Sequence, residues 1–440
     1  MEAEEPSQSQ ASDQHVKVCS VSCGSSHSIA LLSSDLVLTW GRGEDGQLGH
    51  GDAEDRVGPE AVHALMGKGV TSVHCGAEYT IAVCNEQQHV YSWGWGDFGR
   101  LGHGSCSDCF VPHPIKALAG KKVINVACGD THSIAMTSDG ALYGFGRNLN
   151  GQLGLGNNSD VLQPVLIQAL QGRRVISVAC GAEHTLAALE TGELYAWGWG
   201  RYGNLGDGEK ADRHLPTHVK NLGSIRMRQV SCGWRHSAAI TTDGSVYTFG
   251  WSKYGQLGHG TYEDISTPKR VEGLQGVNVV LLSGGWRHAV AADDQGRMYG
   301  WGWNKFGQVG IGSTQDSVAT PQLIAALQND KVSQFACGWR HTLALTQQGQ
   351  MYSWGRGVNG QLGHAETVDL TSPKLLTALS VGTMKLEELK QTARPQYHYV
   401  PAADRYAVVP DQAHAHMFGG MSVPQAPSIE VPMDEHRSNQ

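Results

Sequence analysis

Several features that would decide the class of this chain are scarce or missing. No run of about 18 apolar residues occurs, so we expect no membrane-spanning helix. The first residues hold neither an apolar stretch nor a basic segment, which argues against a secretion signal. Only 15 of 440 residues are Pro, and Gly does not recur at every third position, which excludes a collagen-like chain. Charged residues make up 17% against 40% hydrophobic ones, a balance typical of a folded protein.

Basic residues are also few. Lys and Arg number 33 against 41 Asp and Glu, and residues 1–15 hold four acidic residues and no basic one. Binding to nucleic acid needs clustered Lys and Arg, so we expect no direct nucleic-acid partner. The ten Cys, in a chain without a secretion signal, are expected to be reduced thiols. We therefore expect a soluble, intracellular protein.

Glycine and tryptophan are abundant instead, with 57 Gly and 12 Trp, and an internal repeat explains most of them. The motif Cys-Gly-x-x-His occurs five times, and degenerate copies at Cys75 and Gly284 complete a series of seven. The second-position glycines are spaced by 52 or 53 residues: Gly24, Gly76, Gly129, Gly181, Gly233, Gly285 and Gly338. Each copy continues into an aromatic-Gly pair and a Gly-x-Leu/Val-Gly run. The repeat thus makes residues 16–380 one domain.

Each copy contains short segments that alternate in hydrophobicity and are separated by turn signals such as Asp243-Gly244. Four short strands in each of seven copies predict an all-β fold, a seven-bladed β-propeller closed into a ring without free edges. A helical solenoid is the alternative, but glycine inside a helix costs about 1 kcal/mol per residue. Cys-Gly-x-x-His followed by Trp-Gly-x-Gly-x-x-Gly-Gln-Leu-Gly resembles the regulator-of-chromosome-condensation repeat family of seven-bladed propellers. We expect residues 1–15 to be an acidic disordered tail and residues 381–440 a flexible tail.

Two motifs suggest other chemistry. Gly94-x-Gly96-x-x-Gly99 and its counterparts match the dinucleotide-binding pattern, but they recur with the repeat and no helix follows, so we interpret them as turns. Cys106 and Cys109, with His103 and His113 nearby, could supply zinc ligands, but they form a single loop and we expect no metal site there. The repeat cysteines lie in different blades and are not expected to cluster around a metal. The repeated His is interpreted as a structural hydrogen-bonding group. No arrangement of nucleophile, base and orienting group is evident, so we expect no enzyme and no cofactor.

We expect functional residues at those positions of the repeat where the residue differs from blade to blade. The two variable residues of Cys-Gly-x-x-His are Trp-Arg in the last three blades alone: Trp234-Arg235, Trp286-Arg287 and Trp339-Arg340. Equivalent positions in a ring share radius and height, so these indoles and guanidiniums should lie side by side on one face. The turn after the second aromatic position is acidic in early blades, at Glu44 and Asp97, and basic in later ones, at Lys253 and Lys305.

A face with one acidic and one basic arc is self-complementary about a two-fold axis, which predicts a homodimer. A solvated charged rim is the alternative. The first aromatic of each blade (Trp40, Trp93, Trp197, Trp301 and Trp354) is interpreted as scaffold. The Trp-Arg pairs could instead form a protein-binding hot spot, a sugar-binding platform or a UV-B-absorbing cluster. The residues alone leave these alternatives open.

The full motifs, including Gly-Trp-Arg-His in three successive blades and residues 94–104 and 250–260, resemble the plant UV-B photoreceptors of this repeat family. That resemblance implies a tryptophan chromophore made of Trp286, Trp234, Trp339 and, from the other subunit, Trp95. It also implies a salt-bridged homodimer interface made of Arg287, Arg340, Arg147, Glu44, Asp97, Asp108, Glu183, Arg235 and Lys253. Light would dissociate the dimer. Phe145 stands where these receptors usually have Trp and is expected to reduce light harvesting; Tyr79, Ala289 and the Cys106/Cys109 pair also depart from their pattern.

After residue 380 the repeat stops, and Val-Pro occurs four times in the remaining segment. Residues 404–411 resemble the Val-Pro motif of those receptors, which implies that Tyr406, Val409 and Pro410 bind the WD-repeat domain of a ubiquitin ligase of the constitutively photomorphogenic type. WD-repeat repressors of UV-B signalling are implied as further partners, and cytoplasm and nucleus as the location. The rival hypotheses are a guanine-nucleotide exchange factor for a small GTPase and a light-independent interaction scaffold. The constant spacing leaves no room for an exchange-wedge insertion, which disfavours the first.

Overall fold

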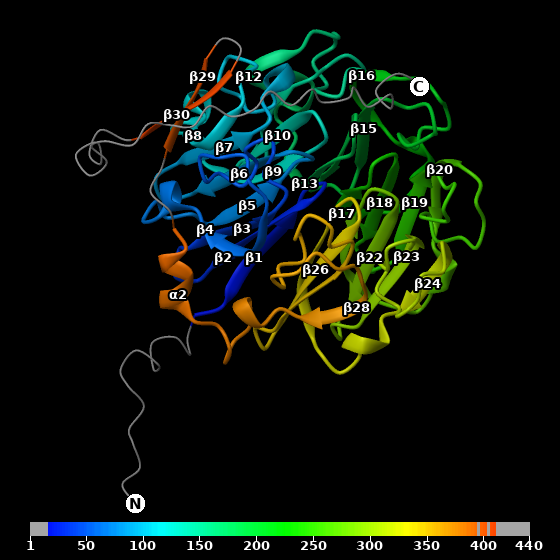
Figure 1. The fold of residues 1–440 in the computed structure, drawn as a ribbon. Coiled ribbons are helices and arrows are strands. Elements are labelled where there is room, and N and C mark those ends of the chain that lie inside the picture. Colours follow the sequence, from blue (N-terminus) through cyan, green and yellow to red (C-terminus); the bar gives the residue numbers. More distant parts are fainter. Residues whose placement is uncertain (1–15, 394–396, 403–404, 411–440) are drawn as a thin grey trace, which may run out of the picture. The chain divides into compact units, whose positions relative to one another are not determined.

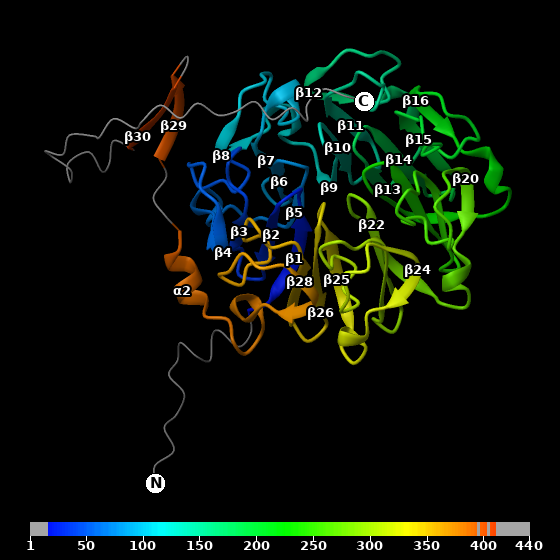
Figure 2. The same cartoon turned by 45° about the vertical axis from the view of Figure 1, so that its right-hand side comes forward.

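The structure, a computed structural model, describes residues 16–393, 397–402 and 405–410. The first of these ranges contains seven four-stranded antiparallel sheets, one blade for each sequence repeat. The blades follow one another around a central axis, so that the first blade (blue) lies beside the last (yellow to orange) in Figures 1 and 2. The predicted all-β, seven-bladed β-propeller is confirmed.

Within each blade the strands follow chain order from the centre of the ring outward. Blades 1 to 4 consist of β1 (Val18–Cys23), β2 (His27–Leu32), β3 (Val37–Gly41) and β4 (Arg56–Ala61); β5 (Ser72–Cys75), β6 (Tyr79–Cys84), β7 (His89–Gly94) and β8 (Cys109–Pro114); β9 (Val123–Cys128), β10 (His132–Thr137), β11 (Leu142–Gly146) and β12 (Val161–Leu166); and β13 (Val175–Cys180), β14 (His184–Leu189), β15 (Leu194–Gly198) and β16 (Arg213–His218). Blades 5 to 7 consist of β17 (Met227–Cys232), β18 (His236–Thr241), β19 (Val246–Gly250) and β20 (Ile265–Arg270); β21 (Val279–Gly284), β22 (His288–Asp293), β23 (Met298–Trp303) and β24 (Ser317–Leu323); and β25 (Val332–Cys337), β26 (His341–Thr346), β27 (Met351–Gly355) and β28 (Leu370–Leu375).

Short 3-10 helices complete the repeat. Seven of them follow the outer strands: η1 (His63–Leu65), η3 (Lys116–Leu118), η4 (Gln168–Leu170), η5 (Lys220–Leu222), η6 (Glu272–Leu274), η7 (Ala325–Leu327) and η8 (Thr377–Leu379). Another, η2 (Asp97–Gly99), lies in a turn of blade 2. None of the helices in the part of the chain that the structure describes is long and apolar enough to cross a membrane.

The hydrophobic core lies between neighbouring blades. Each cluster of buried side chains combines residues of two blades, because the second strand of every blade is buried along its whole length. The five tryptophans predicted to be scaffold have no exposed surface: Trp40, Trp93, Trp197, Trp301 and Trp354. Four of them also donate Nε1–H to a main-chain carbonyl of the preceding blade, as Trp301 does to Gln256 at 2.9 Å. Their scaffold role is confirmed.

In five of the seven blades the repeated His bonds a hydroxyl of the next blade. His27 Nε2 lies 3.0 Å from Thr80 Oγ1, and four further histidines meet a Ser or Thr hydroxyl in the same way. Tyr79 takes the place of His in blade 2 and bonds Ser133 Oγ at 2.8 Å. Burial lowers the pKa of His27 to about 3, so the ring is neutral and its tautomer serves this bond. The predicted structural role of these histidines is confirmed, and we call the bond the histidine latch.

The glycine of Cys-Gly-x-x-His is required by the same latch. A Cβ on Gly24 would lie 2.0 Å from Cε1 of His27, so only Gly allows the imidazole to fold over the loop. The same clash recurs in the other blades.

The predicted absence of free edges is wrong for the outer strands. The ring closes between blades, but the fourth strand of each blade pairs on one side only. Each of these strands carries a Pro where the ladder is irregular: Pro59, Pro112, Pro164, Pro216, Pro268, Pro321 and Pro373. Proline has no N–H to offer a further strand, which protects an exposed edge from pairing.

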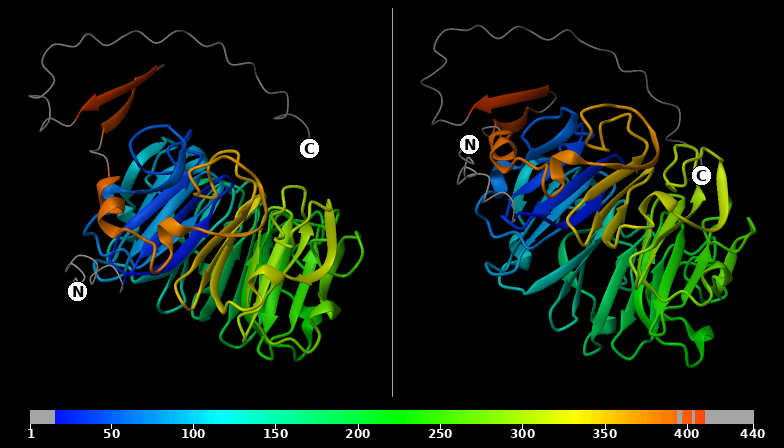
Figure 3. Two further views of the ribbon diagram at one scale, coloured as in Figure 1. Left: turned by 60° about the horizontal axis from the view of Figure 1, so that its bottom comes forward. Right: turned by 90° about the horizontal axis from the view of Figure 1, so that it is seen from below.

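Packing continues past residue 380, where the repeat ends. Helix α2 (Leu386–Gln391) buries Leu386 and Leu389 in the cluster that joins blades 1 and 7. Thr392 Oγ1 accepts a hydrogen bond from the main-chain N–H of Ala61, at the end of β4, at 2.8 Å. Figure 3 shows α2 (orange) beside the first blade (blue). The seam where the ring closes is therefore covered by a segment outside the repeat.

A second unit follows from residue 397. In it, β29 (Tyr397–Ala402) and β30 (Arg405–Pro410) pair as an antiparallel hairpin with Tyr397 opposite Pro410. The predicted partner-binding residues Tyr406, Val409 and Pro410 belong to β30.

Candidate functional site: a face of tryptophan and arginine

Backbone hydrogen bonds join neighbouring Cys-Gly-x-x-His loops at five of the seven blade junctions in the described chain. The N–H of Trp234 donates to the carbonyl of Gly285 at 3.3 Å, and that of Trp339 donates to Gly24 across the closing seam at 3.3 Å. The second variable position meets the same loop, since the N–H of Trp303 donates to the carbonyl of Arg287 at 2.8 Å. Both sets of variable residues therefore lie together on one face, as predicted.

Three indoles form the centre of this face. The ring centroid of Trp286 lies 5.5 Å from that of Trp234 at an angle of 62°, and 5.5 Å from that of Trp339 in a stacked arrangement at 18°. These separations lie in the range of favourable aromatic contact. The expectation that the three Gly-Trp-Arg-His motifs would place their indoles side by side is confirmed.

Each guanidinium covers an indole. Cζ of Arg287 lies 3.6 Å from the ring centroid of Trp286, and that of Arg235 lies 3.8 Å from the ring centroid of Trp234. Arg340 reaches the Trp286 ring at 4.8 Å. Burial lowers the pKa of Arg287 and of Arg340 from the usual value, although both guanidiniums remain charged. Cation–π attraction of about 0.5–2 kcal/mol per contact holds the layer together.

The sequence interpretation missed a second arc of aromatic rings around these three. It consists of Trp199, Tyr202, Trp251, Tyr254, Trp303 and Phe306, with successive ring centroids at most 5.8 Å apart. Trp251 touches Trp234 at 5.7 Å, and Trp303 touches Trp286 at 5.6 Å. The alternation of Trp at the second aromatic position with Tyr or Phe three residues later was the signal available in the sequence. The cluster is therefore larger than the four residues predicted.

The basic arc lacks acidic partners of its own. Among the residues that the structure describes, Arg147, Arg235, Arg287 and Arg340 have no carboxylate oxygen within 4.0 Å. Arg147 instead lies over the ring of Phe98 at 4.6 Å, and Lys253 is exposed beside Tyr254. A desolvating partner that covered these cations would have to supply carboxylates.

The acidic arc lies across the face in the early blades. Glu44, Asp97 and Asp108 are exposed there, and Asp108 Oδ1 accepts from the N–H of Gly96 at 2.8 Å. Glu44 is ion-paired with Arg42 of the same chain, with Arg42 Nε at 3.1 Å. Glu183 presents its main-chain carbonyl to the N–H of Trp199. The acidic side chains of blades 1 and 2 thus lie in other blades than the Trp-Arg pairs of blades 5 to 7, whereas Arg147 of blade 3 lies among the acidic positions.

Two largely buried carboxyls, Asp130 and Glu78, lie in the loops of this face. Burial raises the pKa of Asp130 to about 7, nearby Glu183 raises it further, and Arg100 and a hydrogen bond from the Trp234 side chain lower it. Burial likewise raises the pKa of Glu78 to about 7, against hydrogen bonds from Ser25 and Gln47 that favour the charged form. Asp130 therefore places a group that titrates near neutrality directly against the cluster.

Trp95, predicted to belong to the chromophore, lies apart from the cluster on the acidic side. Cζ of Arg100 lies 3.9 Å from its ring centroid. Within one chain the structure thus brings together Trp234, Trp286 and Trp339 but leaves Trp95 with the acidic arc.

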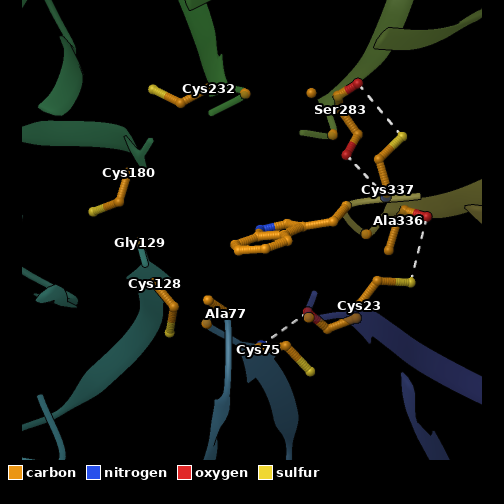
Figure 4. Close-up of a pocket in the computed structure, with 18 of the residues that line it drawn as sticks. Cys23, Cys75, Ala77, Cys128, Gly129, Cys180, Cys232, Ser283, Ala336 and Cys337 are labelled. Atoms are coloured by element: carbon orange, nitrogen blue, oxygen red, sulfur yellow. Dashed lines mark hydrogen bonds between the residues drawn. The ribbon is translucent and has the colours of Figure 1, made fainter. Parts of the chain in front are cut away.

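Six of the repeat cysteines line a central channel of about 440 Å³ together with the three cluster tryptophans. Figure 4 shows these side chains around one space: Cys23, Cys75, Cys128, Cys180, Cys232 and Cys337. Burial raises the pKa of Cys128 and Cys337 to about 12, so both remain protonated thiols. The six do share one space although they belong to different blades.

Within the described ranges, no group of three or more His, Cys, Asp or Glu side chains could hold a metal ion. This finding includes Cys106, Cys109, His103 and His113, the zinc ligands considered in the sequence analysis. His103 Nε2 bonds Ser92 Oγ at 2.8 Å, and His113 Nδ1 bonds the carbonyl of Val111 at 2.9 Å. Cys106 is exposed and Cys109 is half-buried.

Seven blades around a shared face, five of them joined to the next by the histidine latch, define the class of this protein. Its sequence matches the model of the RCC1-like domain over residues 117–398, and models of the regulator of chromosome condensation (RCC1) repeat over 34–83, 88–136 and 18–47. The chain belongs to the RCC1 repeat family of seven-bladed propellers.

Within this family the chain is similar to the ultraviolet-B receptor UVR8 of Arabidopsis thaliana, with 50% identity over 422 residues that cover 95% of each chain. The resemblance to plant UV-B photoreceptors drawn from the motifs is thereby confirmed. The human E3 ubiquitin-protein ligase HERC2 is 38% identical over 320 residues, which are 72% of this chain but only 7% of HERC2. That similarity concerns a small part of a much longer protein.

Solved structures support the architecture. Human WBSCR16 matches with a TM-score of 0.70 and 25% identity over 78% of this chain and 94% of its own. Prp20p of Saccharomyces cerevisiae also matches with a TM-score of 0.70, at 24% identity over 83% and 89% of the two chains. At this identity the likeness to Prp20p shows the fold alone.

Proposed function

We propose that this protein is a UV-B photoreceptor whose own tryptophans form the chromophore and whose homodimer dissociates on illumination. The observation that carries the proposal is the cluster in which Arg287 covers Trp286 at 3.6 Å while Trp234 and Trp339 contact the same indole. The similarity to UVR8 along 95% of both chains supports it. The light-absorbing group and the charges that would hold the dimer are then the same few residues.

In the dark state two copies face each other about a two-fold axis, with the basic arc of one over the acidic arc of the other. By the resemblance, Arg287 pairs with the partner's Asp97 and the partner's Asp108, Arg340 with the partner's Glu44, and Arg147 with the partner's Glu183. Arg235 and Lys253 extend the basic side. The lack of carboxylates near these arginines within the described part of one chain supports this arrangement. Glu44 would share its carboxylate between Arg42 and the partner's guanidinium.

Excitation weakens these pairs because the indole and the guanidinium are in contact. An excited indole is a strong electron donor, and Arg287 on its face is the group that accepts or feels the displaced charge. Trp339, stacked on Trp286, shares the excitation, and the partner's Trp95 completes the cluster. Once Arg287 loses its charge complementarity, the carboxylates opposite remain desolvated without partners, which favours separation.

The released monomer signals through its C-terminal segment. By the resemblance, Tyr406, Val409 and Pro410 bind the WD-repeat domain of a ubiquitin ligase of the constitutively photomorphogenic type, and WD-repeat repressors end the signal. The protein would act in cytoplasm and nucleus, with nuclear accumulation after UV-B. No observation favours an exchange factor or a light-independent scaffold over this function.

The substitution Arg287→Ala tests the proposed dimer interface in the dark. We expect the wild type to be a dimer by light scattering at low salt, and the variant to raise the dimer dissociation constant by about two orders of magnitude. Arg174→Ala is the matched control, because Arg174 precedes β13 at the end opposite the Gly181 loop and pairs with Glu190. A wild type that is monomeric in the dark, or a control that dissociates as readily as Arg287→Ala, would contradict the proposed interface.

A further inference from the structure

One position of the repeat carries a buried cation in blade 2 alone. Arg100 has no exposed surface. The equivalent residues of the other six blades are equally buried but are all amides: Gln47, Gln152, Asn204, Gln256, Gln308 and Gln361. A charged group replaces a neutral one on the side of the ring that carries the acidic arc.

The amide normally closes the turn that precedes it. In five blades the Gln side-chain oxygen accepts a hydrogen bond from the main-chain N–H two residues earlier, at 2.9–3.0 Å; Tyr254 with Gln256 is one example. A guanidinium has donors only and cannot accept this bond. The turn of blade 2 therefore cannot close in the same way.

The turn of blade 2 is reversed to suit a donor. Arg100 Nε donates to the main-chain carbonyl of Asp97 at 2.9 Å, so that this carbonyl, instead of the N–H of Phe98, faces the buried side chain. Phe98 has a φ of 63°, whereas its counterparts in the other six described blades have negative φ. This is where η2 forms. Because Arg100 donates a hydrogen bond where the amides of other blades accept one, the backbone at Phe98 adopts a different conformation.

The same guanidinium holds two further parts of the face. It lies over the indole of Trp95 at 3.9 Å, and its Nη1 donates to the main-chain carbonyl of Asp130 at 3.1 Å. Asp130 belongs to the next blade, and its carboxyl meets the side chain of Trp234. Arg100 is thus in contact with the Trp95 turn, the Asp97 turn and the loop that reaches the tryptophan cluster.

We propose that Arg100 is the positioning residue of the acidic arc: its donors impose the reversed turn at Asp97–Phe98 and so fix where Asp97 and Trp95 are presented to a second copy of this chain. The dimer part of this inference rests on the proposed function; the turn part does not. Charge assists as well, because Arg100 lies close enough to Asp97, Asp108 and Asp130 to interact with all three.

Arg100→Gln tests the inference, because it restores the residue that the repeat uses in five other blades and should fold. We expect a crystal structure of the variant to show Phe98 with negative φ and its N–H bonded to the introduced amide oxygen, and near-UV circular dichroism to show a changed Trp95 environment. The dark dimer dissociation constant should rise about tenfold, while the thermal midpoint is unchanged or higher.

Arg100→Lys keeps the charge but not the planar fork, and should weaken the dimer to a similar extent. Gln361→Asn gives blade 7 the amide of blade 4 and loses the turn bond from Asn359, so it should lower the thermal midpoint slightly and leave the dimer dissociation constant unchanged.

The outcomes separate the parts of the inference. A variant that keeps φ of Phe98 positive overturns the claim about the turn, and a reversed turn with an unchanged dissociation constant overturns the claim about presentation. An Arg100→Lys variant that behaves as the wild type shows that charge alone suffices, which also overturns the positioning role. If the wild type is monomeric in the dark, the proposed function fails, and the conformation of Phe98 in Arg100→Gln alone decides the inference.

Discussion

At the scale of single residues, seven copies of one repeat provide internal comparisons for each position. The histidine latch is an example. His27, His132, His184, His288 and His341 each meet a Ser or Thr hydroxyl of the next blade. His236 does not, because Ala289 stands where the hydroxyl would be, and its buried Nε2 has no hydrogen-bond partner in the described part of the chain. A buried ring nitrogen without a partner lowers stability.

Ala289→Ser should therefore stabilise the protein. The new hydroxyl would meet His236 Nε2 and could donate to the carbonyl of Gln256, as Thr342 donates to Gln308 at 3.0 Å. We expect a gain of about 1 kcal/mol in the free energy of unfolding, measured by chemical denaturation. Ala292→Ser is the control, since Ala292 lies in the same strand among apolar side chains and its hydroxyl would remain unpaired. Equal effects of the two substitutions would show that the latch does not act as described.

The Trp-Arg pairs could be predicted from the sequence because they occur in only three of the seven repeats. The scaffold tryptophans could be predicted because an aromatic residue stands at their position in every repeat. The role of Arg100 could not be predicted, although the sequence shows Arg where other blades have Gln or Asn. Arg100 reverses a peptide of the turn because its buried side chain donates a hydrogen bond where Gln accepts one. This difference becomes visible only in the structure, where the turn and the side chain are seen together.

At the scale of elements, the blades follow from the repeat, whereas helix α2 does not. Alternating short segments between turn signals predicted four strands in each copy. Helix α2 lies outside the repeat, so no internal comparison pointed to it. Its Leu386 and Leu389 are buried against side chains of blades 1 and 7, where the ring must close without a covalent link. The seam thus depends on a six-residue helix that the repeat could not reveal.

Leu389→Ala should weaken this seam. Truncating a buried Leu costs about 2–4 kcal/mol through lost burial and the cavity that remains, and we expect a loss of this size in chemical denaturation. Lys390→Ala, on the exposed side of the same helix, should change stability by less than about 0.5 kcal/mol. A chain ending at residue 380 should melt below one ending at residue 396. If Leu389→Ala is as stable as the wild type, α2 does not contribute to ring closure.

At the scale of the whole molecule, the face of the ring combines its light-absorbing and its charged groups. The sequence predicted the position and charge of the two arcs, because equivalent positions in a closed ring must share one face. It did not predict the extent of the aromatic layer, in which Trp251 and Trp303 bridge the inner and outer rings. Nor did it predict that six thiols from separate blades share one channel, since that depends on how far each inner strand reaches toward the axis.

The central claim is that light absorbed by this cluster separates two copies of the chain. Its most direct test is the molar mass of the purified full-length protein, measured by light scattering after size-exclusion chromatography in the dark and after narrow-band UV-B. The account predicts a dimer in the dark and a monomer after illumination, and a dimer under both conditions for Trp286→Phe, which keeps an aromatic ring but removes the central indole. A wild-type dimer that persists under UV-B, or a Trp286→Phe dimer that dissociates as the wild type does, would contradict it.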